Sequence, residues 1–233
     1  MYRPKAIIFD VNETLLDLAP LKSSVGKALG GREEIVPLWF STMLHYSLVE
    51  TLSENYHSFG DIGIAALIMV AASQGIELER EEAKAAIASQ LRSLPPHPDV
   101  VAGLKALSAD GFRLVCLTNS PTAGVDAQLK HAGLTDLLEK HYSIESVQKY
   151  KPHPDTYQMV LSDLGIEPAE GLMVAAHAWD LAGAKNVGLQ TAFVDRPGAF
   201  LYANAAKPDY RVNDLAELVK VLQSMGETAP TAP

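Results

Sequence analysis

The chain has 233 residues, 48% of them hydrophobic and 20% charged, which excludes an intrinsically disordered protein and allows one α/β domain or a core with a sizeable insertion. Its formal net charge of −9 argues against nucleic acid as a partner. No stretch approaches the roughly 18 apolar residues of a membrane span, and no leader precedes the first strand-like segment, so we expect a cytoplasmic protein.

That first segment, Ala6–Phe9, is one of four short apolar runs that predict buried parallel strands. The other three are Leu114–Leu117, Leu172–Val174 and Thr191–Val194. Segments with helical periodicity lie between them, each followed by a glycine, the usual stop of a helix: Val100–Ala109, Gly124–Ala132 and Pro154–Leu164. The alternation predicts a Rossmann-like parallel sheet, with reactive groups where the carboxyl ends of its strands open into loops.

Residues 17–96 interrupt this alternation, because they hold helical patterns and no convincing strand. They end at a stretch with three prolines in the four positions after Leu94, and proline cannot continue a helix. We therefore predict an α/β protein with a Rossmann-like core, residues 1–16 and 97–233, and an inserted helical cap, residues 17–96. The active site is expected at their junction.

Polar residues follow the predicted strands. Asp10 comes directly after the first strand, and its carboxylate can attack an electrophile or simply cap a turn. Thr118 and Asn119 end the second strand, where they can bind an oxygen or halide or form an ordinary turn. Lys151 precedes a proline, and a lysine near a carboxylate lowers the pKa of that carboxylate. His177 follows the third strand and titrates near neutrality, where it could take a proton from water.

Taken in this order, these segments resemble the haloacid dehalogenase superfamily over about residues 5–197, and within it the type II L-2-haloacid dehalogenases. The motif positions that match are Asp10, Thr14, Asn119, Lys151, Tyr157, Trp179 and Asp180. The resemblance implies that Asp10 is a covalent nucleophile and that small 2-haloacids are hydrolysed to 2-hydroxyacids through an aspartyl ester. It also implies water activation by Asp180, no metal cofactor and a homodimer.

The residue two positions after Asp10 bears on the choice between dehalogenase and phosphatase. Superfamily phosphatases have a second aspartate there, which protonates the leaving alcohol, whereas this chain has Asn12. An amide cannot exchange a proton in that way, but a halide leaves without protonation. A magnesium-dependent phosphatase stays open as a rival, because oxygen atoms of this site could hold magnesium. A catalytically silent binding protein is the second rival.

Three departures from the dehalogenase pattern concern the substrate and the water. Phe40 replaces a cap arginine associated with substrate and halide binding, and Asn12 replaces a tyrosine. Ala175 and His177 replace a serine and an asparagine that position the hydrolytic water. Phe40 could instead wall an apolar pocket. Two cap histidines, His45 and His57, are read as surface residues or as a replacement cation, and Glu13, at a family glycine position, as a tolerated turn residue.

Overall fold

The computed structural model describes residues 3–226, so residues 1–2 and 227–233 of the predicted core lie outside the description. The described residues form a parallel six-stranded sheet in the order β3-β2-β1-β4-β5-β6. Its strands are β1 Ala6–Phe9, β2 Arg113–Thr118, β3 Lys140–Ser143, β4 Gly171–Ala175, β5 Gln190–Val194 and β6 Tyr210–Val212. The predicted α/β fold with a Rossmann-like sheet is therefore confirmed.

The four predicted strands correspond to β1, β2, β4 and β5, which lie next to one another in the sheet. These strands are almost fully buried, so each is a continuous apolar run that the sequence makes visible. The prediction missed β3 and β6, which form the two edges. Edge strands are partly exposed, and their short sequences, KHYS and YRV, carry charged residues that hide the apolar signal.

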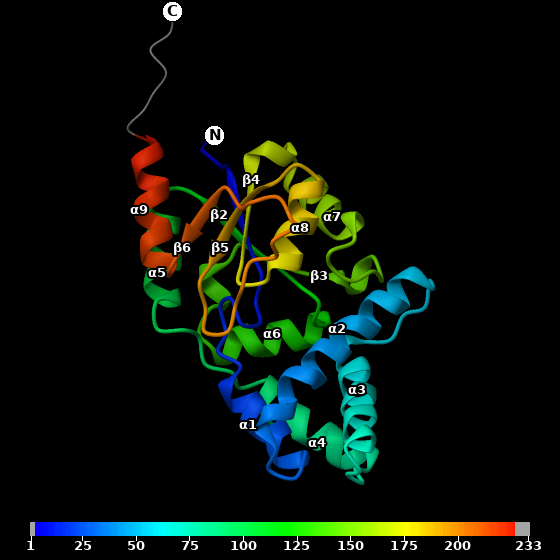
Figure 1. The fold of residues 1–233 in the computed structure, drawn as a ribbon. Coiled ribbons are helices and arrows are strands. Elements are labelled where there is room, and N and C mark those ends of the chain that lie inside the picture. The colour runs from blue at the N-terminus through cyan, green and yellow to red at the C-terminus, as the bar shows by residue number, and fades with distance from the viewer. Residues whose placement is uncertain (1–2, 227–233) are drawn as a thin grey trace, which may run out of the picture.

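Helices cover both faces of the sheet, with α5 and α9 on one face and α7 and α8 on the other (Figure 1). The core helices are α5 Val100–Ala109, α6 Thr122–His131, α7 Pro154–Leu164, α8 Ala178–Asn186 and α9 Leu215–Gly226, with short 3-10 turns at Thr135–Leu137, Ile144–Ser146 and Pro168–Glu170. The predicted bounds of α5 and α7 are confirmed. The helix α7 begins with a proline at its first position and ends before Gly165, whose φ of 65° is the left-handed conformation that glycine favours.

Four further helices lie apart from the sheet, all within residues 17–96 (Figure 1). They are α1 Ala19–Ala28, α2 Val36–Leu52, α3 Phe59–Ser73 and α4 Arg80–Leu91, with a 3-10 turn at Glu33–Ile35. The two chain crossings between this cap and the core run side by side. The amide of Asp17 donates to the carbonyl of Pro95 at 2.8 Å, and the amide of His97 to that of Leu15 at 2.9 Å. The cap is therefore anchored by a short antiparallel pair of segments.

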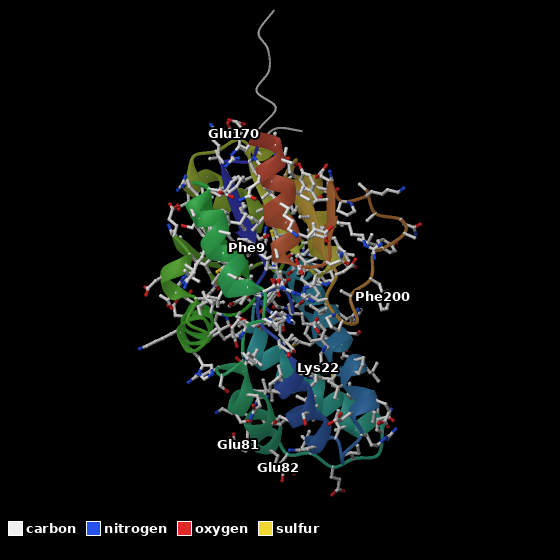
Figure 2. The ribbon with its side chains drawn as sticks, turned by 90° about the vertical axis from the view of Figure 1, so that its left-hand side faces the viewer. Phe9, Lys22, Glu81, Glu82, Glu170 and Phe200 are labelled. Atoms are coloured by element: carbon white, nitrogen blue, oxygen red, sulfur yellow. The ribbon has the colours of Figure 1, made fainter. Side chains whose placement is uncertain are left out.

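Figure 2 places Lys22 of α1 between the core, where Phe9 lies, and the far end of the cap, where Glu81 and Glu82 lie.

A search of residues 3–226 for a helix long and apolar enough to cross a membrane finds none.

Candidate active site

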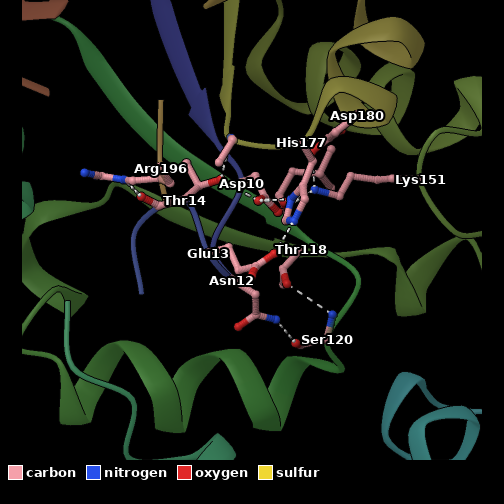
Figure 3. A network of polar contacts seen from close by, with 12 residues as sticks. Asp10, Asn12, Glu13, Thr14, Thr118, Ser120, Lys151, His177, Asp180 and Arg196 are labelled. Carbon is pink, nitrogen blue, oxygen red and sulfur yellow. Dashed lines mark hydrogen bonds and ion pairs between the residues drawn. The ribbon is translucent and has the colours of Figure 1, made fainter. Parts of the chain in front are cut away.

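The polar residues predicted from strand ends meet above the carboxyl edge of the sheet (Figure 3). Asp10 follows β1, and its amide donates to the carbonyl of Val174 in β4 at 3.0 Å. Thr118 ends β2, and His177 is the N-cap residue of α8, the helix that follows β4. Because β1 lies between β2 and β4, these three strand ends converge on one point.

The Asp10 carboxylate is almost completely buried and accepts hydrogen bonds on both oxygens. Lys151 Nζ lies 2.9 Å from Oδ1, while the Thr14 hydroxyl and His177 Nδ1 lie 2.6 and 3.0 Å from Oδ2. Burial raises the pKa of Asp10, but the charge of Lys151 and the hydrogen bond and charge of His177 outweigh it and hold that pKa well below its usual range. The carboxylate is therefore ionised at neutral pH.

Lys151 lies in the core of the protein with no exposed side-chain surface. Its ammonium donates to Asp10, to the carbonyl of Leu117 at 2.9 Å and to Asp180 Oδ2 at 2.6 Å, which uses all three of its protons. Burial lowers the pKa of Lys151, but the two carboxylates more than compensate and raise it. Asn119 supports this arrangement, because its Oδ1 accepts the backbone N–H of Lys151 at 3.1 Å.

Asp180 lies in the first turn of α8 and is held by Tyr157, whose hydroxyl donates to Oδ1 at 2.6 Å. Burial raises the pKa of Asp180, Lys151 lowers it and the charge of Asp10 raises it, with a net increase. A carboxylate with a raised pKa is a stronger base than an ordinary one. Lys151 bonds to both carboxylates, so Asp180 lies beside Asp10. A base for the second half of a two-step reaction is required at this position.

His177 lies between two carboxylates, with Nδ1 3.0 Å from Asp10 and Nε2 2.9 Å from Glu13 Oε2. Burial lowers the pKa of His177, but the hydrogen bonds to Asp10 and Glu13 raise it to about 9. Both ring nitrogens therefore carry protons at neutral pH and donate to carboxylates. This geometry does not favour the expected role of His177 as a base for water, because both ring nitrogens are bonded to carboxylates.

Two aromatic rings stack on His177. Phe40 of the cap lies with its ring centroid 6.2 Å away, and Trp179 of α8 at 5.1 Å. Two cavities meet at Phe40. One, of about 330 Å³, is also lined by Trp39, Asn12 and Gln128, and the other, of about 590 Å³, by Glu13, His177 and Trp179. Phe40 lines both cavities, and its role as an apolar wall for the substrate stays a prediction.

Glu13 is a site residue that sequence reasoning set aside as a tolerated turn residue, which is wrong. Besides His177 it binds Lys22 of the cap, whose Nζ lies 2.6 Å from Oε1. Its φ of 63° is the conformation that favours glycine. The signal that could have found it is the combination of a carboxylate near the nucleophile with a histidine at a functional motif position.

Asn12 and Thr118 take positions beside Asp10 rather than in contact with its carboxylate. The Asn12 amide donates to the Ser120 hydroxyl at 3.2 Å and accepts from Gln128 at 3.0 Å, while the Thr118 hydroxyl accepts the Ser120 N–H at 3.1 Å. Sequence reasoning did not name Gln128. Of the two cap histidines, both are exposed, and His57 pairs with Glu50 at 2.8 Å, so neither replaces the cap arginine.

The carboxylates of the site are engaged in hydrogen bonds within the protein. Each of the four carboxylate oxygens of Asp10 and Asp180 already accepts a hydrogen bond from a lysine, histidine, threonine or tyrosine side chain. Within residues 3–226 no group of three or more histidine, cysteine or acidic side chains is arranged to hold a metal ion. A magnesium ion, which prefers several oxygen ligands, would have to compete with these hydrogen-bond donors for the carboxylates.

Comparison with known proteins identifies the family. Residues 4–188 match the model of the haloacid dehalogenase-like hydrolases. The chain belongs to this family. It is 30% identical over 221 residues to an (S)-2-haloacid dehalogenase of Pseudomonas sp. (strain YL), covering 94% of this chain and 95% of that protein. The structure of an L-2-haloacid dehalogenase from Xanthobacter autotrophicus superposes with a TM-score of 0.86 at 28% identity, covering 95% and 99% of the two chains. A second structure of that enzyme, with chloropropionic acid covalently bound, gives a TM-score of 0.85 at the same identity and coverage.

In this haloacid dehalogenase-like hydrolase, the second and third residues after the nucleophile, Asn12 and Glu13, make different contacts. Asn12 has both ends of its amide bonded to neighbours and offers no proton to the nucleophile. Glu13 instead adds a negative charge next to His177, so the residues near the nucleophile form an alternating series of anions and cations.

Proposed function

We propose that this protein hydrolyses (S)-2-haloacids to 2-hydroxyacids through an ester formed on Asp10. The observation that carries the proposal is a buried, ionised Asp10 beside Asn12, which cannot donate a proton. An alcohol leaving from phosphorus needs a proton donor, whereas a halide leaves as a stable anion. The site therefore suits carbon–halogen cleavage better than phosphoester cleavage.

In the first step an Asp10 oxygen attacks the carbon that bears the halogen, from the side opposite the halide, and the configuration at that carbon inverts. The apolar walls at Phe40 and Trp179 suit the carbon skeleton of the substrate. Lys151 and His177 are the two cations bonded to Asp10, and they keep its carboxylate ionised for the attack. Phe40 occupies the cap position where the family resemblance leads us to expect an arginine, so the cap supplies no positive charge at that position.

In the second step water attacks the carbonyl carbon of the Asp10 ester, and Asp180 accepts its proton. The raised pKa of Asp180 supports this role, and Lys151, bonded to both carboxylates, holds Asp180 in place after Asp10 has lost its charge. Two steps through a carboxylate nucleophile avoid the direct attack of water on the substrate carbon, which is slow because water is a weak nucleophile.

We further propose that the reaction needs no metal or other cofactor, which the side-chain hydrogen bonds to all four carboxylate oxygens of Asp10 and Asp180 support. The proposed partner is a small 2-haloacid. The homodimer and the cytoplasmic location stay predictions, and sedimentation of the purified protein measures the first of them.

The proposal is tested by measuring halide release from (S)-2-chloropropionate and chloroacetate, beside phosphate release from a panel of small phosphoesters, each with EDTA and with added magnesium. We expect halide release that EDTA does not reduce and no phosphate release above background. The Asp10→Asn variant, assayed promptly after purification, is the control for background hydrolysis.

Phosphate release that EDTA abolishes and magnesium restores would assign the protein to the phosphatase branch. Absence of turnover with both kinds of substrate would instead indicate a binding protein.

A further inference from the structure

The charged network extends beyond the nucleophile to the Glu13 carboxylate. Glu13 accepts from His177 Nε2 at 2.9 Å on one oxygen and from Lys22 Nζ at 2.6 Å on the other. Its side chain is 23% exposed, and its backbone takes the left-handed conformation that residues with a Cβ adopt at a cost. The strained backbone orients this carboxylate toward His177, so the conformation of the turn determines the contact.

In the free enzyme two carboxylates share the His177 cation. When Asp10 becomes an ester it loses its negative charge, and the attraction that it exerted on the histidine proton disappears. Of the groups that hydrogen-bond to His177 within residues 3–226, Glu13 is then the one that still carries a charge. Because an opposite charge at hydrogen-bond distance favours the protonated ring, Glu13 decides whether His177 stays a cation at this stage.

We propose that Glu13 is a positioning residue that keeps His177 protonated during the second half of the reaction, so that Nδ1 donates to the acyl oxygen of the Asp10 ester. The inference rests on the proposed function. Oδ2 is the acyl oxygen in this account, because it accepts from two donors, Thr14 at 2.6 Å and His177 at 3.0 Å. Donors at these distances stabilise the negative charge that develops on an acyl oxygen.

Water adds to Cγ of Asp10, its proton passes to Asp180, and the electron pair of the carbonyl moves to Oδ2, which accepts hydrogen bonds from Thr14 and His177. The carbonyl then re-forms and the bond from Cγ to Oδ1 breaks. Oδ1 leaves with the 2-hydroxyacid and takes the proton from Asp180, and the new carboxyl group of Asp10 loses its own proton to solvent.

Several other charged groups act on His177. Lys151 and Asp180 lie on the far side of Asp10, Lys22 lies on the far side of Glu13, and Glu33 and Arg196 line the same cavity as His177. Arg196 is neutralised by Asp99 at 2.8 Å. Phe40 and Trp179 stack on the ring and limit its contact with water. Burial lowers the pKa of His177, and the bonds to Asp10 and Glu13 together raise it to about 9, consistent with the geometric argument.

The Glu13→Gln variant tests the proposal, because it keeps the shape and a hydrogen-bond acceptor but removes the charge. In single-turnover experiments with (S)-2-chloropropionate we expect halide release to keep its rate within about twofold, and ester hydrolysis near pH 8 to slow by about tenfold or more, as expected for loss of a charged donor to an acyl oxygen. The ester should then accumulate as an added mass on the protein. The high-pH limb of kcat should move to lower pH, because His177 loses its proton more easily.

The matched control is Glu34→Gln, which removes an exposed carboxylate that pairs with Arg32 at 3.0 Å. We expect both steps and the pH limb to match those of the wild type in this control. Equal slowing of both steps in Glu13→Gln, or a limb that stays at its wild-type pH, would overturn the role of Glu13.

A second measurement needs no substrate. NMR titration of histidine ring signals, with His177 assigned by its absence in His177→Asn, should give a midpoint near 9 in the wild type and a clearly lower one in Glu13→Gln. An unshifted midpoint in the variant would refute the role of Glu13. Failure of the wild type to release halide would instead refute the proposed function, so the two failures are distinguishable.

Discussion

At Asp10, burial and neighbouring charges shift the pKa of the carboxylate in opposite directions. Burial alone would raise its pKa and leave a neutral, non-nucleophilic acid, and the two bonded cations reverse that effect. The charge of Lys151 is the largest single effect that lowers this pKa, and it acts from a position with no exposed side-chain surface. A buried lysine placed between two carboxylates therefore sets the charge state of the nucleophile.

Replacing Lys151 with methionine tests this dependence. We expect halide release to fall by about 100-fold or more, a loss typical of removing one preorganised charge from a site. The pKa of Asp10 should rise, so the low-pH limb of activity should move to higher pH. The measurement is the pH profile of halide release, with circular dichroism to check the fold.

Lys149→Met is the control for this substitution, since Lys149 pairs with Asp155 at 2.9 Å in a more exposed position. Wild-type activity with an unchanged low-pH limb in Lys151→Met would contradict the assigned role of Lys151.

The residues of the site differ in how far the sequence could predict them. Asp10 and Lys151 could be predicted, because their motifs place them at the ends of buried strands and at a proline stop. The contact between Glu13 and His177 could not, because 164 positions separate the two residues and a left-handed turn decides where the carboxylate points. A turn of that kind has no clear sequence signal when the residue is not glycine.

At the scale of elements, α8 and its N-cap residue carry three of the groups that surround the nucleophile, His177, Trp179 and Asp180, and the close approach of α8 to α7 depends on a glycine. A Cβ on Gly183 would lie 2.4 Å from the Pro152 side chain and 2.7 Å from the Tyr157 hydroxyl. Real Cβ atoms essentially never approach other atoms so closely, so any side chain there must push α8 away from Tyr157. The hydrogen bond from Tyr157 to Asp180 would then lengthen or break.

We predict that Gly183→Ala lowers the free energy of unfolding by about 1–3 kcal/mol, the usual cost of overpacking a core, and also reduces ester hydrolysis. Chemical denaturation measures the first effect, and accumulation of the ester as an added mass on the protein in a single turnover measures the second.

Gly124→Ala in α6 is the matched control, because its Cβ would meet Pro121 at 3.5 Å, an ordinary van der Waals contact. Inside a helix that change should leave stability unchanged or raise it by up to about 1 kcal/mol. Equal stability of the two variants would contradict the account of α8.

In the molecule as a whole, segments that are distant in sequence together form one site between cap and core. The nucleophile comes from the first strand, Phe40 from the cap, and the supporting cations and base from the second half of the chain. The four central strands and the presence of a helical insertion could be predicted, because apolar runs and proline stops are local features. The stacking of Phe40 on His177 could not be predicted, since it depends on how the cap packs against the core.

Covalent attack by Asp10 is the central claim, and a single turnover in oxygen-18 water tests it most directly. With enzyme in excess over (S)-2-chloropropionate, we expect unlabelled oxygen in the product hydroxyl and label in the peptide that contains Asp10, because the product takes its oxygen from the aspartate and water replaces it. Label in the product hydroxyl after one turnover would contradict the account, since it would show that water attacked the substrate carbon directly.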